Sequence, residues 1–357
     1  MKKFLRSILL IVNMVFVVLM LLSTLSGTLP PEKHGWIALL SYGYFPLLLC
    51  NVAFIIIWLF MGRWEFLVSV AAIVLRFSFV GLFFQAGGCT DVEAADDNLK
   101  VLSFNTHGFA GMDDDDFPAD SGISAFFEII DEEQPDVMCL QECFCHKPFY
   151  DSLKVKGYKY HYGNNGRGKN SPSVVISRWP IVYTSPENGE TKFFVDIEKE
   201  GHPMRVCCVH LNSYKMDQED LEVLQGLAHG QLIDTMPNMV EKLKRASREH
   251  QVEWDSVLKP MLENSRVPVV LAGDFNDTPA SYIYHQATKL FVDSYVEQGR
   301  GFGTTYHGPY PAFRIDYILH SPSMKTLSYK RIKTSISDHY PIVVQLSLPD
   351  GTGNHVD

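Results

Sequence analysis

The N-terminal quarter of the chain contains three long apolar segments. Residues 8–22 are apolar except for Asn13, residues 36–60 are interrupted by only a few small, neutral polar or proline residues, and residues 66–84 contain one charge, Arg76. Each segment is close to the roughly 20 residues that a helix needs to cross a hydrocarbon core of about 30 Å. The pattern therefore predicts three transmembrane helices and a multi-pass membrane protein.

Basic residues flank these segments unevenly. Lys2, Lys3, Arg6 and Arg63 lie on one side of the predicted membrane, whereas only Lys33 lies on the other. Because Lys and Arg near the ends of spans stay in the cytoplasm, this bias predicts a cytoplasmic N-terminus. With three spans, everything after the third lies on the extracytoplasmic side.

The first segment also has features of a secretory signal peptide. Three basic residues precede it, and Ser26 and Gly27 are small enough to support cleavage. Its length and the two further spans favour an uncleaved anchor. The second and third spans keep the same orientation whether or not the first segment is cleaved.

A different pattern begins near Leu99, where short β-prone runs alternate with helical segments. Strands are expected at residues 100–105, 136–142, 173–177, 181–184, 193–197, 204–211, 267–272, 314–319, 327–332 and 341–347. Helices are expected at residues 123–133 and 148–155, and two or three more within 217–263. This alternation predicts an α/β domain in which two β-sheets pack as a sandwich with helices outside.

Five of these apolar runs end in polar residues that are suited to binding metal or to moving protons. The segment VPVVLAGDFND, residues 267–277, delivers Asp274, Asn276 and Asp277 to one edge of a sheet. One such strand end is commonly just an Asx turn. The same arrangement recurs in KVLSFN, DVMCLQE, VCCVHLN and the region from RIDYIL to SDH, and five such ends in one domain indicate a functional site.

In their order and residue types these motifs resemble the endonuclease/exonuclease/phosphatase superfamily, which has the DNase-I-like fold. The resemblance covers residues 99–348 and implies a four-layer catalytic domain that hydrolyses phosphate esters with Mg²⁺ or Mn²⁺. The remaining chain then comprises a membrane anchor, residues 1–86, an acidic linker, residues 87–98, and a flexible tail, residues 349–357.

The resemblance also implies roles for individual residues. Glu142 corresponds to the principal metal ligand, with Asn105 and Asp338 beside it. Asp274 and Asn276 correspond to the pair that orients the attacking water and the phosphoryl oxygen. His210 corresponds to a phosphate contact that protonates the leaving oxygen, and Asp316 to the carboxylate that orients His339. The implied sets are catalytic His210, Asp274, Asn276, Asp316 and His339, and metal-binding Asn105, Glu142 and Asp338.

Three further residues are weaker candidates for binding substrate. His107 follows the Asn105 strand, Asn212 follows the His210 strand, and Arg314 begins the RIDYIL run. An Arg beside a strand is more often a salt-bridge residue, and a strand-end Asn is usually a turn residue.

The chemistry of phosphodiester hydrolysis calls for this set of groups independently of the resemblance. The reaction needs an activated water, stabilisation of charge on the non-bridging oxygens and a proton for the departing oxygen. A hard, hydrated Mg²⁺ suits one or two carboxylates plus substrate phosphate. The sequence therefore predicts a membrane-anchored, divalent-metal-dependent phosphoesterase.

Charge bears on the substrate. From residue 91 onward the chain has 25 Lys and Arg against 39 Asp and Glu, a net charge of −14. Proteins that grip a nucleic-acid backbone normally have the opposite balance, since phosphate neutralisation supplies most of the non-specific affinity. The charge and the predicted anchor favour a lipid-borne or small phosphate ester over nucleic acid.

Two alternatives stay open at this stage. One is an extracytoplasmic nuclease that acts on DNA, and the other is a catalytically inactive relative retained for binding. The complete set of site residues favours an active enzyme. The lipid bilayer is the one macromolecular partner that the sequence indicates, and it points to no protein partner.

Overall fold

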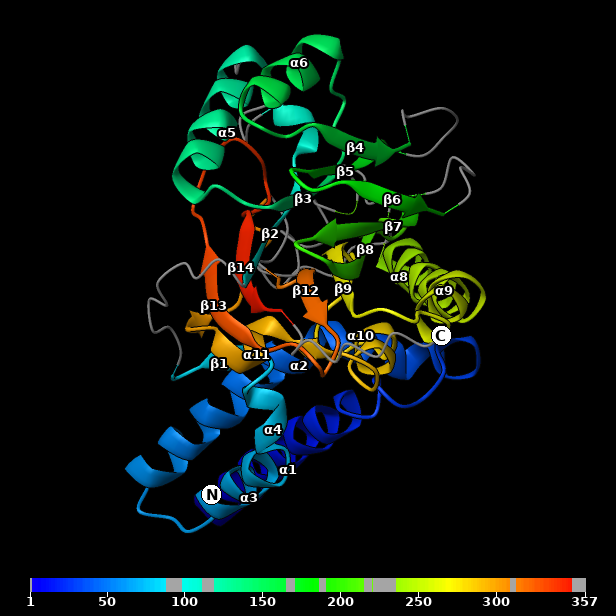
Figure 1. The fold of residues 1–357 in the computed structure, drawn as a ribbon. Coiled ribbons are helices and arrows are strands. Elements are labelled where there is room, and N and C mark those ends of the chain that lie inside the picture. The colour runs from blue at the N-terminus through cyan, green and yellow to red at the C-terminus, as the bar shows by residue number, and fades with distance from the viewer. Residues whose placement is uncertain are drawn as a thin grey trace. The chain divides into compact units, whose positions relative to one another are not determined.

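The computed structural model describes residues 2–87, 98–110, 119–164, 171–185, 191–214, 220, 236–308 and 313–348 (Figure 1). Residues 88–97 of the predicted linker, the predicted tail and most of residues 217–235 lie outside these ranges. The chain forms two compact units. Unit 1 comprises Met1–Phe84, Ser213–Val252 and Asp277–Ala287, and unit 2 comprises Gln85–Asn212, Glu253–Asn276 and Thr288–Asp357.

Unit 2 contains two six-stranded mixed sheets. One has the strand order β10 (Val292–Asp293), β12 (Asp316–His320), β9 (Val269–Asp274), β8 (His202–His210), β7 (Lys192–Lys199), β6 (Ile181–Thr184). The other has the order β13 (Thr326–Arg331), β14 (Ile342–Ser347), β2 (Asn98–Asn105), β3 (Val137–Gln141), β5 (Ser173–Ser177), β4 (Tyr160–Gly163). The predicted α/β fold with two sheets is confirmed.

Alternating apolar residues on β2 explain the layering, because successive side chains of a strand point to opposite faces. Leu99 and Val101 belong to the core between the sheets, together with residues of β7, β8 and β9. Leu102 and Phe104 belong to a second core that includes residues of α5 (Ala119–Glu133) and α6 (Lys147–Val155). Helices therefore cover the outer face of this sheet, as the sequence predicts.

Strand pairing brings the polar strand ends together. The parallel pair β2 and β3 places Asn105 opposite Gln141, one residue before Glu142. The parallel pair β8 and β9 places His210 opposite Asp274, and antiparallel β12 places Asp316 opposite the same residue. The sheet registers thus fix where these functional groups stand.

Short elements complete unit 2. They are η1 (His107–Phe109), the π-helical turn η2 (Trp254–Leu258), α9 (Lys259–Glu263), α11 (Ser294–Gln298) and β11 (Gly301–Phe302). The strand β1 (Phe84–Gln85) lies where the chain passes from unit 1 to unit 2. From residue 236 onward, the predicted helical region 217–263 consists of α8 (Met236–Glu253) followed by η2 and α9.

Unit 1 contains α1 (Lys2–Ser23), α2 (Pro31–Phe60), α3 (Phe66–Leu75), α4 (Phe77–Val80), almost all of α8, and α10 (Tyr282–Ala287). The helices α1 and α2 are long and apolar enough to cross a membrane. The prediction of a third continuous transmembrane helix is wrong. Arg76 has non-helical backbone angles, φ −120° and ψ 30°, and separates α3 from α4.

A buried chain of hydrogen bonds joins the three apolar segments of unit 1. Asn13 on α1 donates to the hydroxyl of Ser69 on α3 at 2.7 Å, and accepts from the indole of Trp58 on α2 at 3.0 Å. The Ser69 hydroxyl donates to the amide oxygen of Asn51 at 2.9 Å. Polar side chains that bond across helices in this way hold apolar helices together where no water is present to compete.

Candidate active site

Three residues of the candidate site have backbone conformations that non-glycine residues rarely adopt. The φ angles of His107, Glu142 and Asn276 are 44°, 53° and 48°. Each such conformation costs on the order of 1–3 kcal/mol, and strain of this kind gathers at functional sites. All three residues lie one or two positions after the end of a strand. The positive φ angle changes the direction of each side chain from the one that the extended strand would give it.

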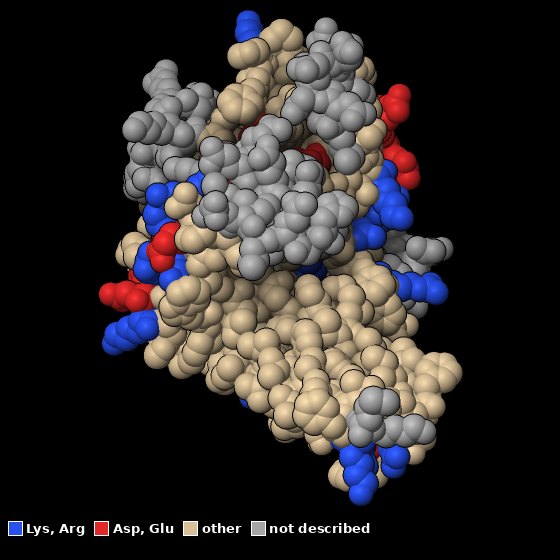
Figure 2. All heavy atoms as spheres, turned by 180° about the vertical axis from the view of Figure 1, so that it is seen from behind, with Lys and Arg blue, Asp and Glu red and all other residues tan. Residues whose placement is uncertain are grey.

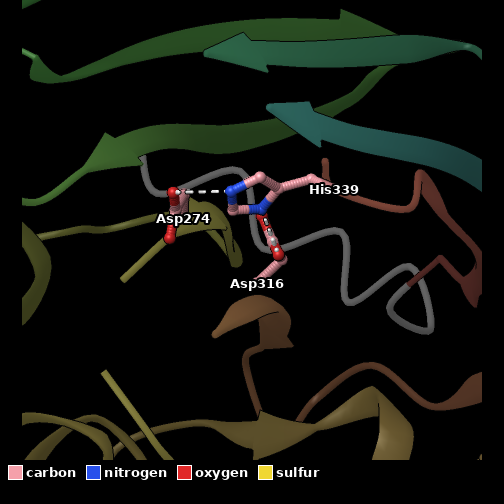
Figure 3. Close-up of side chains that lie close together, drawn as sticks. All are labelled: Asp274, Asp316 and His339. Atoms are coloured by element: carbon pink, nitrogen blue, oxygen red, sulfur yellow. Dashed lines mark hydrogen bonds and ion pairs between the residues drawn. The ribbon is translucent and has the colours of Figure 1, made fainter. Parts of the chain in front are cut away.

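The core of the site is a buried line of acid, base and acid (Figure 3). The Nδ1 atom of His339 lies 2.9 Å from Oδ2 of Asp316, and its Nε2 atom lies 3.8 Å from Oδ2 of Asp274. All three side chains are at most 6 % exposed. A hydrogen bond to Asp316 fixes the tautomer and the orientation of the imidazole, which leaves Nε2 facing Asp274.

The surroundings shift the pKa values of this line. Burial and the charge of Asp316 raise the pKa of Asp274 to about 7, against the opposing effects of His339 and Asn105. Burial alone would lower the pKa of His339, but the carboxylates of Asp316 and Asp274 raise it to about 10. Near neutral pH the imidazole of His339 is therefore protonated on both nitrogens and positively charged, whereas the carboxyl of Asp274 is able to accept and release a proton.

Glu142 stands at the centre of a second group. It receives a hydrogen bond from Nδ2 of Asn105 at 3.4 Å, and its Oε2 lies 3.6 Å from Nδ1 of His107. The same His107 nitrogen lies 3.8 Å from Oδ1 of Asp338. Burial would raise the pKa of Glu142, but His107 and His210 outweigh it and lower the pKa to about 2. Glu142 is thus a carboxylate at any physiological pH.

Asn105 connects the two groups. Its Nδ2 atom also donates to Oδ2 of Asp274 at 3.0 Å, and its Oδ1 accepts from the backbone of His107 at 3.1 Å. One amide at the end of β2 therefore sets the spacing between Glu142 and Asp274.

His210, at the end of β8, faces both carboxylates. Its Nε2 lies 3.6 Å from Oε1 of Glu142 and 3.9 Å from Oδ2 of Asp274. Burial lowers the pKa of His210. Its side chain is 7 % exposed, and neither ring nitrogen has a hydrogen-bond partner among the described residues. A neutral imidazole without a partner is suited to donate to a ligand that enters the site.

The other sequence candidates divide between the site and its surroundings. The backbone of Asn276 donates to Oδ1 of Asp274 at 2.7 Å, and its side chain donates to the carbonyl of Leu211 at 3.0 Å. Asn212 is exposed after the His210 strand. Arg314 is buried, with Nη1 2.8 Å from Oδ2 of Asp293 and its guanidinium over the ring of Tyr295, so its contacts are those of a structural ion pair.

Several supporting residues are not predicted by the sequence analysis. The hydroxyl of Ser337 donates to the carbonyl of Asn105 at 2.8 Å and accepts from the backbone of His339 at 3.1 Å. The hydroxyl of Thr305 accepts from the backbone of Asp316 at 3.1 Å. The SDH motif contains a signal for Ser337, whereas nothing in the local sequence marks Thr305.

The donor set fits a divalent cation. Glu142 and Asp338 approach the same His107 nitrogen from two sides, which is where a positive charge is best stabilised. Asp274, Asp316 and His339 also offer ligand atoms within 4.8 Å of one another. Carboxylate and amide oxygens, which Glu142, Asp338 and Asn105 supply, are the ligands that Mg²⁺ or Mn²⁺ prefers in proteins.

Comparison with known proteins establishes the family. A sequence model of the endonuclease/exonuclease/phosphatase family matches residues 102–339, which span the site from β2 to His339. The chain belongs to this family. It is accordingly an enzyme, a hydrolase that acts on phosphate ester bonds. A second model, described as a domain of unknown function (DUF8431), matches residues 6–83 of the apolar N-terminal region.

Individual relatives are distant. A DNA-(apurinic or apyrimidinic site) endonuclease of Dictyostelium discoideum is 22 % identical over 294 residues, which cover 71 % of this chain and 72 % of that protein. The catalytic domain of human Nocturnin with bound sulfate is 16 % identical with a TM-score of 0.50, and covers 72 % of this chain and 95 % of its own. D. rerio TDP2 with a single-strand DNA product is also 16 % identical with a TM-score of 0.50, and covers 70 % and 98 %. The two structures show that the fold is shared.

Proposed function

We propose that this family member is a membrane-anchored phosphodiesterase that depends on Mg²⁺ or Mn²⁺ and acts on the extracytoplasmic side. The observation that carries the catalytic part is the buried contact of Asp316, His339 and Asp274, with Glu142 and His210 beside it. These are the groups needed to activate water, to stabilise a phosphoryl oxygen and to protonate a leaving group.

We propose the following proton transfers. Asp274, with a pKa of about 7, accepts the proton of the attacking water. The protonated His339, held by Asp316, donates a hydrogen bond to a non-bridging phosphoryl oxygen. His210 donates a hydrogen bond to the departing oxygen, which takes up the proton that Asp274 accepted from the water, and the side chain of Asn276 stabilises the loop that presents the base.

The metal would be held by Glu142 with Asn105 and Asp338, and when bound it would supply Lewis acidity toward the phosphoryl oxygens. The strong depression of the Glu142 pKa keeps this carboxylate ready for a cation at all physiological pH values. Glu142 and Asp338, which both lie near Nδ1 of His107, are the carboxylates that would hold the cation.

Two substrate classes remain candidates. The net charge of −14 after residue 90 supports a small or lipid-borne phosphate ester, because long polyanions are repelled. The names of two relatives support DNA, since one is a DNA endonuclease and one holds a single-strand DNA product. A phosphodiester bond is common to both classes, so the same proposed reaction applies to each.

The first test uses the full-length protein in detergent with Mg²⁺ or Mn²⁺. We expect it to hydrolyse bis-p-nitrophenyl phosphate and one of two natural classes, plasmid DNA or vesicles that contain sphingomyelin or phosphoinositide. Activity should disappear with EDTA and return when Mg²⁺ is added in excess. Adding Ca²⁺ that is free of Zn²⁺ instead of Mg²⁺ is the control, because Ca²⁺ should not restore activity. Metal-independent turnover, or no turnover of any substrate by protein that binds Mn²⁺, would contradict the proposal.

Exposed apolar residues support the anchor. They extend over residues 4–18 of α1, 49–60 of α2 and 67–75 of α3, as expected for helices that face lipid. Figure 2 shows the corresponding region of unit 1 almost free of charged residues, with Lys and Arg gathered at one end. Arg6, near the start of α1, pairs with the buried Glu65, which precedes α3.

Contacts within unit 1 support the extracytoplasmic orientation. The helix α1 has 22 residues and is thus about 33 Å long, close to the thickness of a hydrocarbon core. Arg6 is near its start, whereas Ser26, just past its end, donates to the carbonyl of Ala280 at 2.6 Å. The ring of Phe79 on α4 stacks on that of His285, with the ring centroids 5.2 Å apart. The chain between Glu65 and Phe79 therefore returns to the side of unit 1 where Ser26 contacts Ala280.

This orientation predicts the outcome of protease protection. In spheroplasts, protease added from outside should cleave the chain after residue 90, whereas an epitope tag at the N-terminus should be cut only after permeabilisation. A cytoplasmic marker protein that survives in the same sample shows that the membrane is intact. Protection of the C-terminal region until permeabilisation would mean that the chain faces the cytoplasm.

A further inference from the structure

The segment that follows the catalytic loop is bound by the apolar N-terminal helices. Residues 277–287 begin directly after Asn276, and they belong to unit 1 together with α1 and α2. Ala280 lies in one hydrophobic core with Val17, Met20, Tyr44 and Phe79. The hydroxyl of Ser26 donates to the carbonyl of Ala280, and that of Thr278 donates to the carbonyl of Ser41 at 3.3 Å.

A buried polar group stands at the start of this segment, and we call it the Tyr42 network: Tyr42, Tyr214, His250 and Asp277. Oδ1 of Asp277 accepts from the hydroxyl of Tyr42 at 3.0 Å, and Oδ2 lies 3.0 Å from Nδ1 of His250. The backbone of Thr278 also donates to Oδ1 at 2.9 Å. The side chains of His250 and Asp277 are 1 % and 4 % exposed.

The carboxylate of Asp277 determines which hydroxyl group donates in each hydrogen bond of the Tyr42 network. A carboxylate cannot donate, so the single proton of the Tyr42 hydroxyl points to Asp277. The hydroxyl of Tyr214, 2.6 Å from that of Tyr42, must then donate to the Tyr42 oxygen. The chain of donors runs from Tyr214 through Tyr42 to the carboxylate, and hydrogen bonds in such a chain strengthen one another in a dry environment.

The consequence concerns Asn276, which is joined to Asp277 by a peptide bond. Asn276 has a φ of 48° and donates from its backbone to the proposed base, Asp274. A strained residue keeps such a conformation only when the chain on both sides is fixed. On one side it is fixed by β9, and on the other side by Asp277 within the Tyr42 network.

We propose that Tyr42 on α2 is a positioning residue that acts through Asp277, and along the chain from it, on Asn276 and Asp274. The apolar N-terminal helices then do more than attach the enzyme to a membrane. They complete the fold of the chain that follows the catalytic loop. This inference deepens the proposed function and uses the same reaction for its main test.

The test compares two identical changes on one helix. Tyr42→Phe removes the hydroxyl that binds Asp277, whereas Tyr44→Phe removes a hydroxyl that has no hydrogen-bond partner among the described residues. Tyr44 lies two positions along α2 and is 1 % exposed. Each variant is purified as the full chain in detergent, and kcat and KM for bis-p-nitrophenyl phosphate are measured with saturating Mg²⁺, well below the Tm of the variant.

We expect Tyr42→Phe to lower kcat about tenfold with little change in KM, and Tyr44→Phe to match the wild type. A displacement of about 1 Å in a reacting group is enough for such a loss. Asp277→Asn should lower kcat at least as much, and the double variant should be no slower than Asp277→Asn alone, because both changes act along one path. Equal kcat for Tyr42→Phe and Tyr44→Phe would overturn the proposal.

Hydrogen exchange supplies a readout that does not need turnover. Amides of residues 274–281 should exchange faster in Tyr42→Phe than in Tyr44→Phe, with exchange in β2 unchanged. If the wild type hydrolyses none of the phosphodiesters, the proposed function fails, whereas equal exchange in both variants overturns the positioning role alone. Should Tyr42→Phe not fold, Thr278→Val, which loses the bond to Ser41, should lower kcat about threefold, and an unchanged kcat there counts against the proposal.

Discussion

Asp274→Asn should lower kcat by about 10²–10⁴-fold, the usual contribution of a positioned general base. The amide keeps the shape of the side chain and its acceptor oxygen for the backbone of Asn276, but it cannot take a proton. The loss should be in kcat with little change in KM, since the proton moves only in the transition state. Steady-state kinetics of the full-length protein on bis-p-nitrophenyl phosphate measures both.

The same variant should also remove the acidic limb of the pH profile. Burial and Asp316 raise the pKa of Asp274 to about 7, so the carboxyl is protonated below that pH and unable to act as a base. At low Mg²⁺ the wild-type kcat/KM should therefore fall about tenfold for each pH unit below 7 and level off above it. The kcat/KM that remains in Asp274→Asn should not fall in this way as the pH is lowered below 7.

Asp131→Asn is the matched control for the change of charge. Asp131 is exposed on α5, where it pairs with Lys156. Its substitution should leave kcat, KM and the pH profile unchanged, because surface ion pairs of this kind contribute about 0–1 kcal/mol. If Asp274→Asn retained more than a tenth of the wild-type kcat, another group would have to be the base.

The strand pattern explains why so much of the site can be predicted from the sequence. Asn105, Glu142, His210 and Asp274 each follow an apolar run, and in parallel neighbours such ends meet at one edge. The predicted strand at 193–197 differs from β7 only at its ends, which local pattern does not define well. The type and order of most elements depend on short-range periodicity, which the sequence contains.

Features that depend on distant residues could not be predicted. Tyr42 and Asp277 are 235 positions apart, and neither stands in a segment whose pattern indicates the contact. Arg314 at the start of RIDYIL is only a weak candidate for binding substrate, since an Arg beside a strand is more often a salt-bridge residue. Only the fold identifies Asp293 as its partner. The break at Arg76 was equally hidden, because a single charged residue in an otherwise apolar segment does not reveal that the backbone angles leave the helix there.

The strand β4 shows the same limit in a milder form. Tyr160–Gly163 pairs with β5 at the edge of its sheet, and its side chains are exposed or half-buried. An edge strand of this length has no buried face to produce an alternating pattern, so its pairing with β5 is the main evidence for it.

Gly273→Ala should destabilise unit 2 by on the order of 4 kcal/mol and lower Tm by about 10 °C. Gly273 has a φ of 146°, and a Cβ at this position would lie 1.9 Å from the carbonyl oxygen of Val209 on β8. The neighbour is strand backbone that pairs directly with Gly273, so it cannot move without breaking the register of β8 and β9. Thermal unfolding of the full-length protein, followed by circular dichroism, measures the loss.

Gly201→Ala separates the cost of the clash from the cost of the backbone angle. Gly201 also has a positive φ, 83°, but nothing lies within 4 Å of a Cβ placed there, and the turn between β7 and β8 is exposed. It should cost about 1 kcal/mol, the usual penalty for an L-residue in a left-handed conformation. If the two variants lost equal stability, close approach of the strands would not be what requires glycine before Asp274. A much larger loss in Gly273→Ala, with activity reduced even in the fraction that folds, would show that the spacing of β8 and β9 also sets the position of the base.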